Sequence, residues 1–148
     1  MNKYFVSVLV LNFNNGRFLN RSIKSCLNQS YKKIEVLVYD DKSTDESKAI
    51  LKKYKNKKVR VFYNSSNKTN IAAIDAKNGY YNLIKFSKGK IIFLLDSDDY
   101  FQRNKIKEFI KIYKENNQIN FIQDLPTIYL KKKKKLRIKI IYLVFGLI

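Results

Sequence analysis

The stretch Ile91-Ile92-Phe93-Leu94-Leu95-Asp96-Ser97-Asp98-Asp99 decides the fold that we expect for this chain. Its five apolar residues predict a buried strand, and its acidic residues predict that the strand ends in a cluster of carboxylates. In an open α/β sheet, ligands bind just beyond the carboxyl ends of the strands. Neighbouring carboxylates need a cation or hydrogen bonds to offset their repulsion, and oxygen ligands favour Mg²⁺ or Mn²⁺. The stretch therefore predicts a hard-metal site for a phosphate-bearing substrate, although a solvated acidic turn has the same composition.

Strand and helix patterns alternate on both sides of this stretch. Apolar runs predict strands over residues 6–13, 34–39, 59–63 and 90–95, with a short one over 120–123. Helical periodicity covers residues 19–27, 43–54, 71–87 and 106–113. Ser43 and Glu46 fit a capping box that would begin the second helix, and Asn78-Gly79 is a point where the third could break. The alternation predicts an α/β fold, with a mostly parallel sheet and helices on both faces.

Two acidic loops are expected at one edge of that sheet. The loop that begins with Asp40-Asp41 follows the second strand, and Asp96 to Asp99 follow the fourth. Right-handed crossovers between parallel strands would place both loops at the carboxyl edge. The two loops are therefore candidates for one shared cleft.

Composition excludes several kinds of chemistry. The 148 residues suit one domain, and the hydrophobic fraction of 45% is enough for a core. Cys26 is the single cysteine and histidine is absent, so an internal disulfide, a C-x-x-C pair and any histidine base or ligand within this chain are excluded. Chemistry must then use Asp, Glu, Lys, Ser or Tyr.

The formal net charge of +19 is unevenly distributed. Residues 128–148 carry seven Lys/Arg and no acidic residue, which leaves 19 − 7 = +12 for the rest. Nucleic-acid binding would suit this charge, but no nucleic-acid motif is present, and a Lys-, Asn-, Ile- and Tyr-rich composition is what AT-rich codons supply. We interpret the dispersed lysines as codon bias and nucleic acid as an unlikely partner.

The chain divides by composition into residues 1–127 and a basic and apolar tail, 128–148. Lys131 to Lys135 precede an apolar end, a pattern typical of a membrane-surface segment, although an ordinary basic element of a domain cut short would look the same. No signal-peptide pattern and no run of ~18 apolar residues is present. The expectation is a cytoplasmic protein with peripheral contact at the inner membrane surface.

Four motifs stand in order within residues 4–115. They are VSVLVLNFNN (6–15), SCLNQSY (25–31), IEVLVYDDKSTD (34–45) and LLDSDD (94–99). Their sequences, order and spacing resemble those of the family-2 glycosyltransferases, which have the GT-A fold. The first resembles the family's opening strand, the second its S-x-L-x-Q-T-Y, the third its I-E-I-I-V-V-D-D-G-S-T-D and the fourth its D-x-D-D signature.

The resemblance implies a transferase that moves a sugar from a nucleotide-diphosphate donor, usually with inversion, to a glycan or lipid-linked acceptor in cell-envelope polysaccharide biosynthesis. It implies that Phe13, Asp40 and Asp41 hold the nucleotide through its base. It implies a Mg²⁺ or Mn²⁺ ion that is held by Asp98. Asp96 is expected on the sugar or ribose side and is also a candidate metal ligand. Asp99 is expected as a second metal ligand or as a residue that supports the ligands. Lys77 is a candidate phosphate contact.

Departures from the family pattern leave other functions open. Leu11-Asn12 stands where the family has Pro-Thr or Pro-x, Lys42 replaces the usual Gly and predicts a less tight loop, and Lys77-Asn78-Gly79 matches A-R-N-x-G only loosely. Family members are longer, and their catalytic base lies in the second half, whereas only Asp124 follows Glu115 here, so the catalytic residue is unknown. A donor-binding remnant without turnover is the main alternative. A carboxylate-pair glycosidase is disfavoured because Asp98 and Asp99 share one loop.

Overall fold

The computed structural model describes residues 4–54, 58–65, 71–116 and 118. The chain divides into two compact units, Met1–Glu108 and Phe109–Ile148, and the features discussed below lie in the first. Its elements are, in order, β1 (Val6–Asn12), α1 (Gly16–Leu27), β2 (Ile34–Asp40), α2 (Ser47–Lys52), β3 (Val59–Tyr63), α3 (Ala72–Phe86) and β4 (Ile91–Asp96), followed by α4 (Lys105–Glu115), which crosses the unit boundary.

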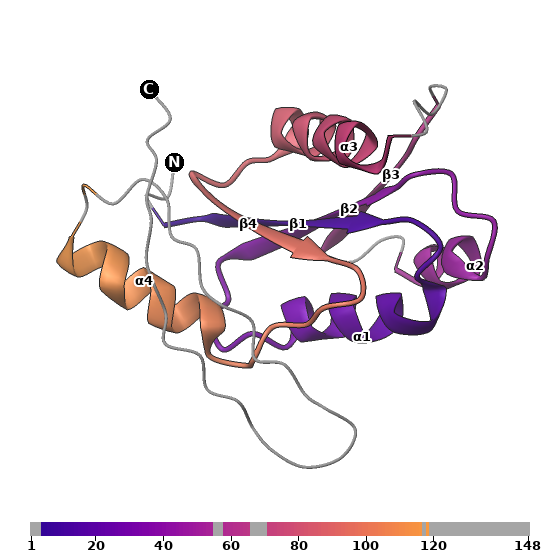
Figure 1. Cartoon of the computed structure of the whole chain (residues 1–148). Helices are drawn as coiled ribbons and strands as arrows, with labels where there is room; N and C mark the ends of the chain where they lie inside the picture. The colour runs from indigo at the N-terminus through magenta and orange to yellow at the C-terminus, as the bar shows by residue number, and fades with distance from the viewer. Residues whose placement is uncertain (1–3, 55–57, 66–70, 117, 119–148) are drawn as a thin grey trace, which may run out of the picture. The chain divides into compact units, whose positions relative to one another are not determined.

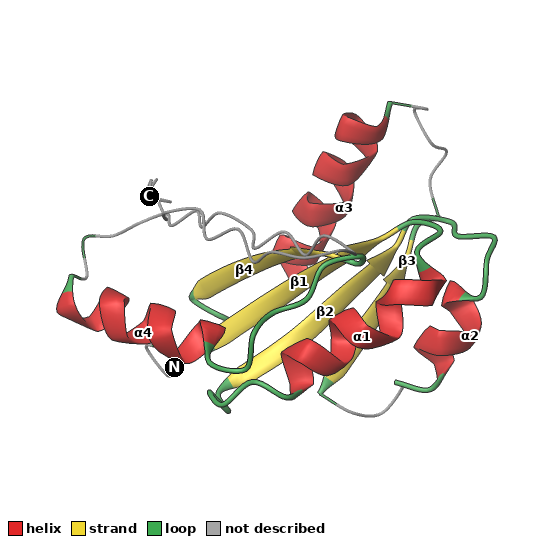
Figure 2. Cartoon of the chain, turned by 60° about the horizontal axis from the view of Figure 1, so that its bottom comes forward, coloured by secondary structure: helices red, strands yellow, loops and turns green. Residues whose placement is uncertain are grey.

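The four strands form one parallel sheet in the order β3-β2-β1-β4 (Figure 1). α3 covers one face, and α1 and α2 lie on the other (Figure 2). The register pairs Asn12 with Asp40 and Leu11 with Asp96, so the ends of β2 and β4 meet on either side of the end of β1. The expected α/β fold with a parallel sheet is confirmed, and both acidic loops lie at its carboxyl edge.

Each strand presents alternate residues to the two helical layers. Leu9, Leu37 and Tyr39 form a buried cluster with Leu83 of α3, and Phe62 of β3 packs against the same cluster. The strand residues next to these in sequence, including Asp40 after Tyr39 and Tyr63 after Phe62, therefore face the α1 and α2 side. This alternation decides which functional side chains share a face of the sheet.

The third helix runs unbroken through Asn78-Gly79, where a break was possible. A Cβ added at Gly79 would lie 2.5 Å from Leu11 Cδ1 and 3.0 Å from Tyr39 Cδ1. The glycine is therefore needed because α3 approaches the sheet closely there. A close contact, and not a turn, accounts for this glycine.

The capping box expected at Ser43 and Glu46 is wrong. α2 begins at Ser47, and no side-chain cap is formed by Glu46. The Ser43 hydroxyl instead accepts hydrogen bonds from Asn14 N at 2.9 Å and from Asn12 Nδ2 at 3.1 Å. Ser43 therefore joins two loops instead of starting a helix.

The other helices and strands follow the sequence pattern closely. Leu19 and Ile23 are buried on α1, Leu51 on α2, and Ile106 on α4. β1 ends at Asn12, one residue before the expected end. The strand expected over 120–123 and the tail, 128–148, lie outside the described residues.

Candidate nucleotide and metal site

The loop after β2 is held together by a buried carboxylate. Asp40 is fully buried; its Oδ1 accepts a hydrogen bond from Asn12 Nδ2 at 2.7 Å, and its Oδ2 accepts one from Ser43 N at 3.3 Å. A buried charge is tolerated only when it is hydrogen-bonded in this way. Asp40 therefore fixes the geometry of the edge, and Asn12, at a position where the family has another residue, is one of its two donors.

Asp41, the candidate contact to the nucleotide base, is held by hydrogen bonds to residues at the ends of both neighbouring strands. Its backbone N donates to Asn12 O at 2.8 Å, and its Oδ1 accepts from Asn64 Nδ2 at 2.6 Å. Asn64, directly after β3, also donates its backbone N to Asp40 O at 2.9 Å. The carboxylate is 5% exposed, so it is oriented before any ligand arrives. Sequence reasoning missed Asn64, because nothing local marks a residue that acts on another strand's loop.

Lys42 adopts the backbone conformation that glycine normally provides. Its φ is 58°, and Asn14 in the facing loop has φ 49°. Asparagine tolerates this left-handed region, but for lysine it costs about 1–2 kcal/mol. The loop thus forms the same kind of turn with Lys42 that it would form with glycine, and the difference is stored as backbone strain.

The acidic loop after β4 is anchored by the residue between its first two carboxylates. Ser97 is 1% exposed; its backbone N donates to Leu11 O at 3.0 Å, and its hydroxyl accepts from Asn15 Nδ2 at 3.2 Å. Because Ser97 points inward, Asp96 and Asp98 on either side of it are exposed, as is Asp99. The loop therefore presents its carboxylates to solvent on a fixed backbone.

Negative charge accumulates on this loop. The pKa of Asp99 is raised by partial burial and then by the neighbouring charges of Asp98 and Asp96, with Arg21 acting in the opposite direction. Arg21 donates from Nη2 to the backbone O of Asp98 at 2.9 Å, and its guanidinium lies 4.6 Å from the Tyr100 ring centroid. A cation arriving at this loop would relieve the repulsion between the carboxylates.

Tyr80 of α3 is a further residue of the site. Its hydroxyl donates to Asp96 Oδ1 at 2.8 Å. Burial, the hydrogen bond to Asp96, and the charges of Asp96 and Asp99 raise the pKa of Tyr80 well above its ordinary value, so the hydroxyl stays protonated at neutral pH. Sequence reasoning missed Tyr80 because α3 reaches Asp96 only through the fold.

The expected metal ligands all lie on the loop after β4. Within the described ranges, no group of three or more His, Cys, Asp or Glu side chains is placed to hold one ion. Mg²⁺ is often bound through only one or two carboxylates plus the phosphates of a substrate. Asp96 and Asp98, which are exposed on one loop, are the residues that would hold an ion of that kind.

Phe13 and Lys77 lie at the margins of the site. Phe13 directly follows β1 and is 48% exposed, so its ring is accessible to a ligand at the carboxyl edge. Lys77 is exposed and lies two positions before Gly79 on α3. Two residues correspond to about 200° around a helix, and Gly79 faces the sheet. Lys77 therefore points away from the contact that Gly79 makes with the sheet, and it neighbours Tyr80, three residues later on α3, whose hydroxyl contacts Asp96.

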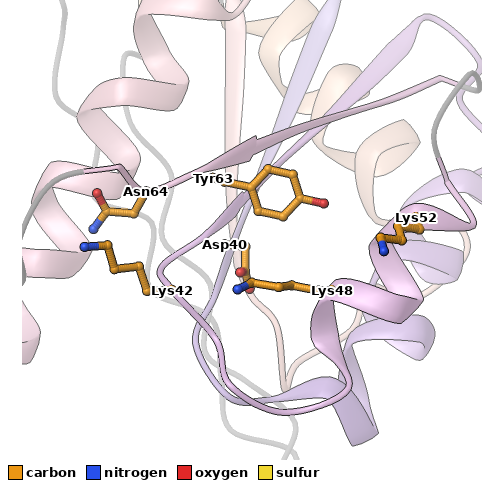
Figure 3. A pocket seen from close by; sticks show the side chains of 6 residues that line it. All are labelled: Asp40, Lys42, Lys48, Lys52, Tyr63 and Asn64. Atoms are coloured by element: carbon orange, nitrogen blue, oxygen red, sulfur yellow. The ribbon is translucent and has the colours of Figure 1, made fainter.

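A pocket of about 350 Å³ lies beside the β2 loop (Figure 3). It is lined by Asp40, Lys42, Lys48, Lys52, Tyr63 and Asn64. Lysines contribute half of its lining residues, and none of them was singled out as a ligand from the sequence. In the part of the chain that the structure describes, no helix is long and apolar enough to cross a membrane.

The parallel sheet, with helices on both faces and aspartates at its carboxyl edge, defines an open α/β domain. The family model described as glycosyl transferase family 2 matches residues 7–145, and the chain belongs to this family.

Proteins of similar sequence are also named as glycosyltransferases. An uncharacterized glycosyltransferase of Haemophilus influenzae is 32% identical over 121 residues, covering 80% of this chain and 46% of the relative. The poly(ribitol-phosphate) beta-N-acetylglucosaminyltransferase TarP of Staphylococcus aureus is 38% identical over 116 residues, covering 76% of this chain and 34% of TarP. The UDP-Glc:alpha-D-GlcNAc-diphosphoundecaprenol beta-1,3-glucosyltransferase WfaP of Escherichia coli is 33% identical over 118 residues, covering 80% of this chain and 41% of WfaP.

Solved structures agree on the fold. S. aureus TarS in complex with UDP has a TM-score of 0.64 and 25% identity, covering 76% of this chain and 32% of that chain. The mannosyltransferase PcManGT of Pyrobaculum calidifontis, solved with GDP-Man and Mn²⁺, shares the fold with a TM-score of 0.69 and 16% identity, covering 84% of this chain and 36% of that chain. This chain spans less than half the length of each of these relatives and solved chains.

Proposed function

We propose that this chain is the donor-binding part of a glycosyltransferase that moves a sugar from a UDP-sugar to a glycan or lipid-linked acceptor, with inversion and with the help of Mg²⁺ or Mn²⁺. The observation that carries the proposal is the exposed pair Asp96 and Asp98, on an anchored loop at the same sheet edge as the preoriented Asp41. Such an edge can hold both ends of a nucleoside diphosphate.

The β2 side of the edge would bind the nucleotide base. The Asp41 carboxylate, held by Asn64, can accept a hydrogen bond from a uracil-like N–H, and the exposed Phe13 ring can pack against the base. Asp40 would support Asp41 from within the fold, since both of its oxygens are engaged by Asn12 and Ser43. In this arrangement Asp41 would contact the nucleotide base, and Asp40 would hold Asp41 in position.

The β4 side would receive the diphosphate. Asp98 and Asp96 would hold the cation, with Asp99 adding negative charge beside them. A divalent cation supplies charge neutralisation for the departing nucleoside diphosphate, an effect of several kcal/mol on a transition state. Tyr80 would keep the Asp96 carboxylate in one orientation through its hydroxyl.

Calorimetry of UDP binding tests this assignment. UDP should bind more tightly with Mn²⁺ or Mg²⁺ than with EDTA, and Asp98→Ala should remove the difference. Glu108→Ala, which removes an exposed carboxylate from α4, is the control and should leave the difference intact. Equal metal dependence in the wild type and Asp98→Ala would exclude Asp98 as a metal ligand.

Sugar transfer is a separate step from donor binding. A turnover assay with UDP-sugars and a lipid-linked glycan acceptor distinguishes a complete transferase from a chain that only binds the donor. Release of UDP that depends on the acceptor supports transfer. Metal-dependent UDP binding with no such release supports the alternative, a donor-binding remnant.

Peripheral membrane contact is the remaining part of the proposal. It rests on the sequence of the tail, where five consecutive lysines precede an apolar end. One Lys or Arg near an anionic bilayer contributes about 1 kcal/mol. The chain should therefore sediment with anionic vesicles at low salt and much less with neutral ones. Replacing Lys131 to Lys135 with Gln should release it, and a wild type that stays in the supernatant with both vesicles would exclude the anchor.

A further inference from the structure

The lysine-lined pocket faces the opposite side of the sheet from the Asp96–Tyr80 pair. Tyr63 is paired in register with Asp40, and it follows Phe62, whose ring stacks on Phe86 of α3 at 4.8 Å. Alternation along the strand therefore turns Tyr63 and Asp40 toward the α2 side, where they line the pocket (Figure 3). Asp96 is paired with Leu11, which packs in the α3 cluster.

The pocket also lies some distance along the sheet from the acidic loop. β2 and β1 separate β3 from β4, so Tyr63 and Asp96 are three strand spacings apart. Neighbouring strands are about 4.8 Å apart, which places these two residues on the order of 14 Å from each other. A diphosphate bound at Asp96 and Asp98 cannot reach across this distance to the lysines on the other face.

Lys42 from the β2 loop and Lys48 and Lys52 from α2 line the pocket on different sides (Figure 3). Among the described residues, Arg60 forms a salt bridge with Glu35, and none of the three pocket lysines has a carboxylate oxygen within 4.0 Å. Asp40 is the one carboxylate in the lining, and both of its oxygens already accept hydrogen bonds from Asn12 and Ser43. Three lysines and one aspartate therefore give the pocket a net positive charge.

Placing these lysines is energetically unfavourable for the protein alone. Lys48 and Lys52 are one turn apart on α2, where like charges destabilise a helix. Lys42 has a left-handed backbone, which strains any residue other than glycine or asparagine. Strain and repulsion that meet at one site point to a ligand that offsets them. Codon bias explains lysines in general, but not two separate unfavourable placements around one pocket.

We propose that this pocket is a second anion site, which binds a phosphate ester group of a ligand other than the nucleotide donor. Lys42, Lys48 and Lys52 would surround the phosphate oxygens, and the Tyr63 hydroxyl would donate one hydrogen bond. The volume of about 350 Å³ is enough for a phosphate and the group attached to it. Phosphate is favoured over a carboxylate because its charge and its several acceptor oxygens can use more than one ammonium group. Burial and the Asp40 charge raise the pKa of Tyr63, which keeps its hydroxyl a donor at neutral pH.

Protein-observed NMR with inorganic phosphate, in EDTA, tests the proposal. EDTA removes divalent cations, so the experiment does not depend on the donor site. Phosphate should shift the amide signals of Lys48, Tyr63 and Asn64 more than those of Ser97 to Asp99. The variant with Lys42, Lys48 and Lys52 all changed to Gln should bind phosphate about tenfold more weakly.

A matched variant removes the same amount of charge elsewhere. Lys33, Lys90 and Lys107 are exposed and line no part of the pocket, so changing all three to Gln should leave the phosphate affinity within about twofold. Tyr63→Phe keeps the ring and should weaken binding by about threefold. Equal losses in the two triple variants, or phosphate shifts centred on the acidic loop, would overturn the proposal.

Two sources of a phosphate ester can be separated in the same series. Glycerol phosphate represents a free ester, and phosphatidylglycerol vesicles represent a lipid headgroup. If the pocket variant loses affinity for glycerol phosphate but sediments with vesicles as the control variant does, the source is a free phosphorylated molecule. If it also loses vesicle binding relative to the control, the source is a lipid headgroup. Undiminished binding of both ligands would overturn the proposal.

Discussion

The loops after β2 and β4 both carry adjacent aspartates at the same sheet edge, yet they use them differently. Asp40 and Asp41 are 0% and 5% exposed and accept hydrogen bonds from Asn12, Ser43 and Asn64. In the β4 loop the buried residue is Ser97, and the aspartates around it are exposed. Similar sequence motifs therefore give a scaffold in one loop and a charged surface in the other.

The difference shows that the partners of a carboxylate, and not its place in a motif, decide its role. A buried carboxylate with several donors stabilises the fold, and removing it leaves those donors unsatisfied. An exposed carboxylate close to others is destabilised by them and is stabilised again when a cation binds. The comparison can be tested by substitutions that should affect stability in one loop and ligand binding in the other.

The largest effect is expected from Asp40→Ala. The substitution removes one of the two acceptors of the Asn12 side-chain amide and leaves the Ser43 backbone N–H without its acceptor in a buried place. We expect a loss of about 3 kcal/mol in the free energy of unfolding, measured with urea. Asp98→Ala should change it by less than about 0.5 kcal/mol. Equal losses for the two variants would contradict the division into scaffold and surface.

Asp41→Ala tests whether Asp41 binds a ligand or, like Asp40, stabilises the fold. If Asp41 accepts a hydrogen bond from the base, UDP binding should weaken by about 1–3 kcal/mol, because an interaction with a charged group is lost. Binding of free pyrophosphate should be almost unchanged, since pyrophosphate has no base. Calorimetry with both ligands gives the answer, and a comparable loss for both would mean that Asp41, like Asp40, acts through the fold or the metal.

The strands and the shared edge could be predicted because they depend on local patterns. Each buried strand is a continuous apolar run, and its polar end is visible in the sequence, so the positions of Asp40 and Asp96 followed from the pattern. The partners of these residues could not be predicted in the same way. Asn64 and Tyr80 reach their carboxylates from other elements, and the Ser43 hydroxyl is engaged by Asn12 and Asn14 from the β1 loop instead of capping α2.

Lys42→Gly should stabilise the scaffold loop. Glycine adopts a φ of 58° without strain, which recovers about 1–2 kcal/mol, and its greater freedom in the unfolded chain takes back about 0.5–1 kcal/mol. We expect a net gain of roughly 0.5–1 kcal/mol in the free energy of unfolding. Lys48→Gly, within α2, is the control and should lose about 1 kcal/mol. A loss for Lys42→Gly would mean that its side chain stabilises the loop more than its backbone strains it.

Tyr80→Phe should have the smallest effect at neutral pH, about 0.5 kcal/mol in the free energy of unfolding, because the Asp96 partner is exposed and water can replace the hydroxyl. The stability advantage of the wild type over the variant should shrink as the pH rises above about 10, and it should then reverse. The pKa of Tyr80 in the folded protein lies above its ordinary value of 10.0, so the unfolded chain loses the proton first. The stability that the protonated Tyr80 contributes is therefore complete below about pH 10 and is lost as the pH rises toward the folded-state pKa. The wild type should lose more stability than Tyr80→Phe between about pH 9.5 and 11, measured by urea unfolding.

Tyr81→Phe removes a hydroxyl from a 59% exposed neighbour on the same helix and should follow the wild type. Parallel profiles for all three proteins would show that α3 does not use Tyr80 to hold the Asp96 carboxylate, and the exposed loop would then be oriented through Ser97 alone.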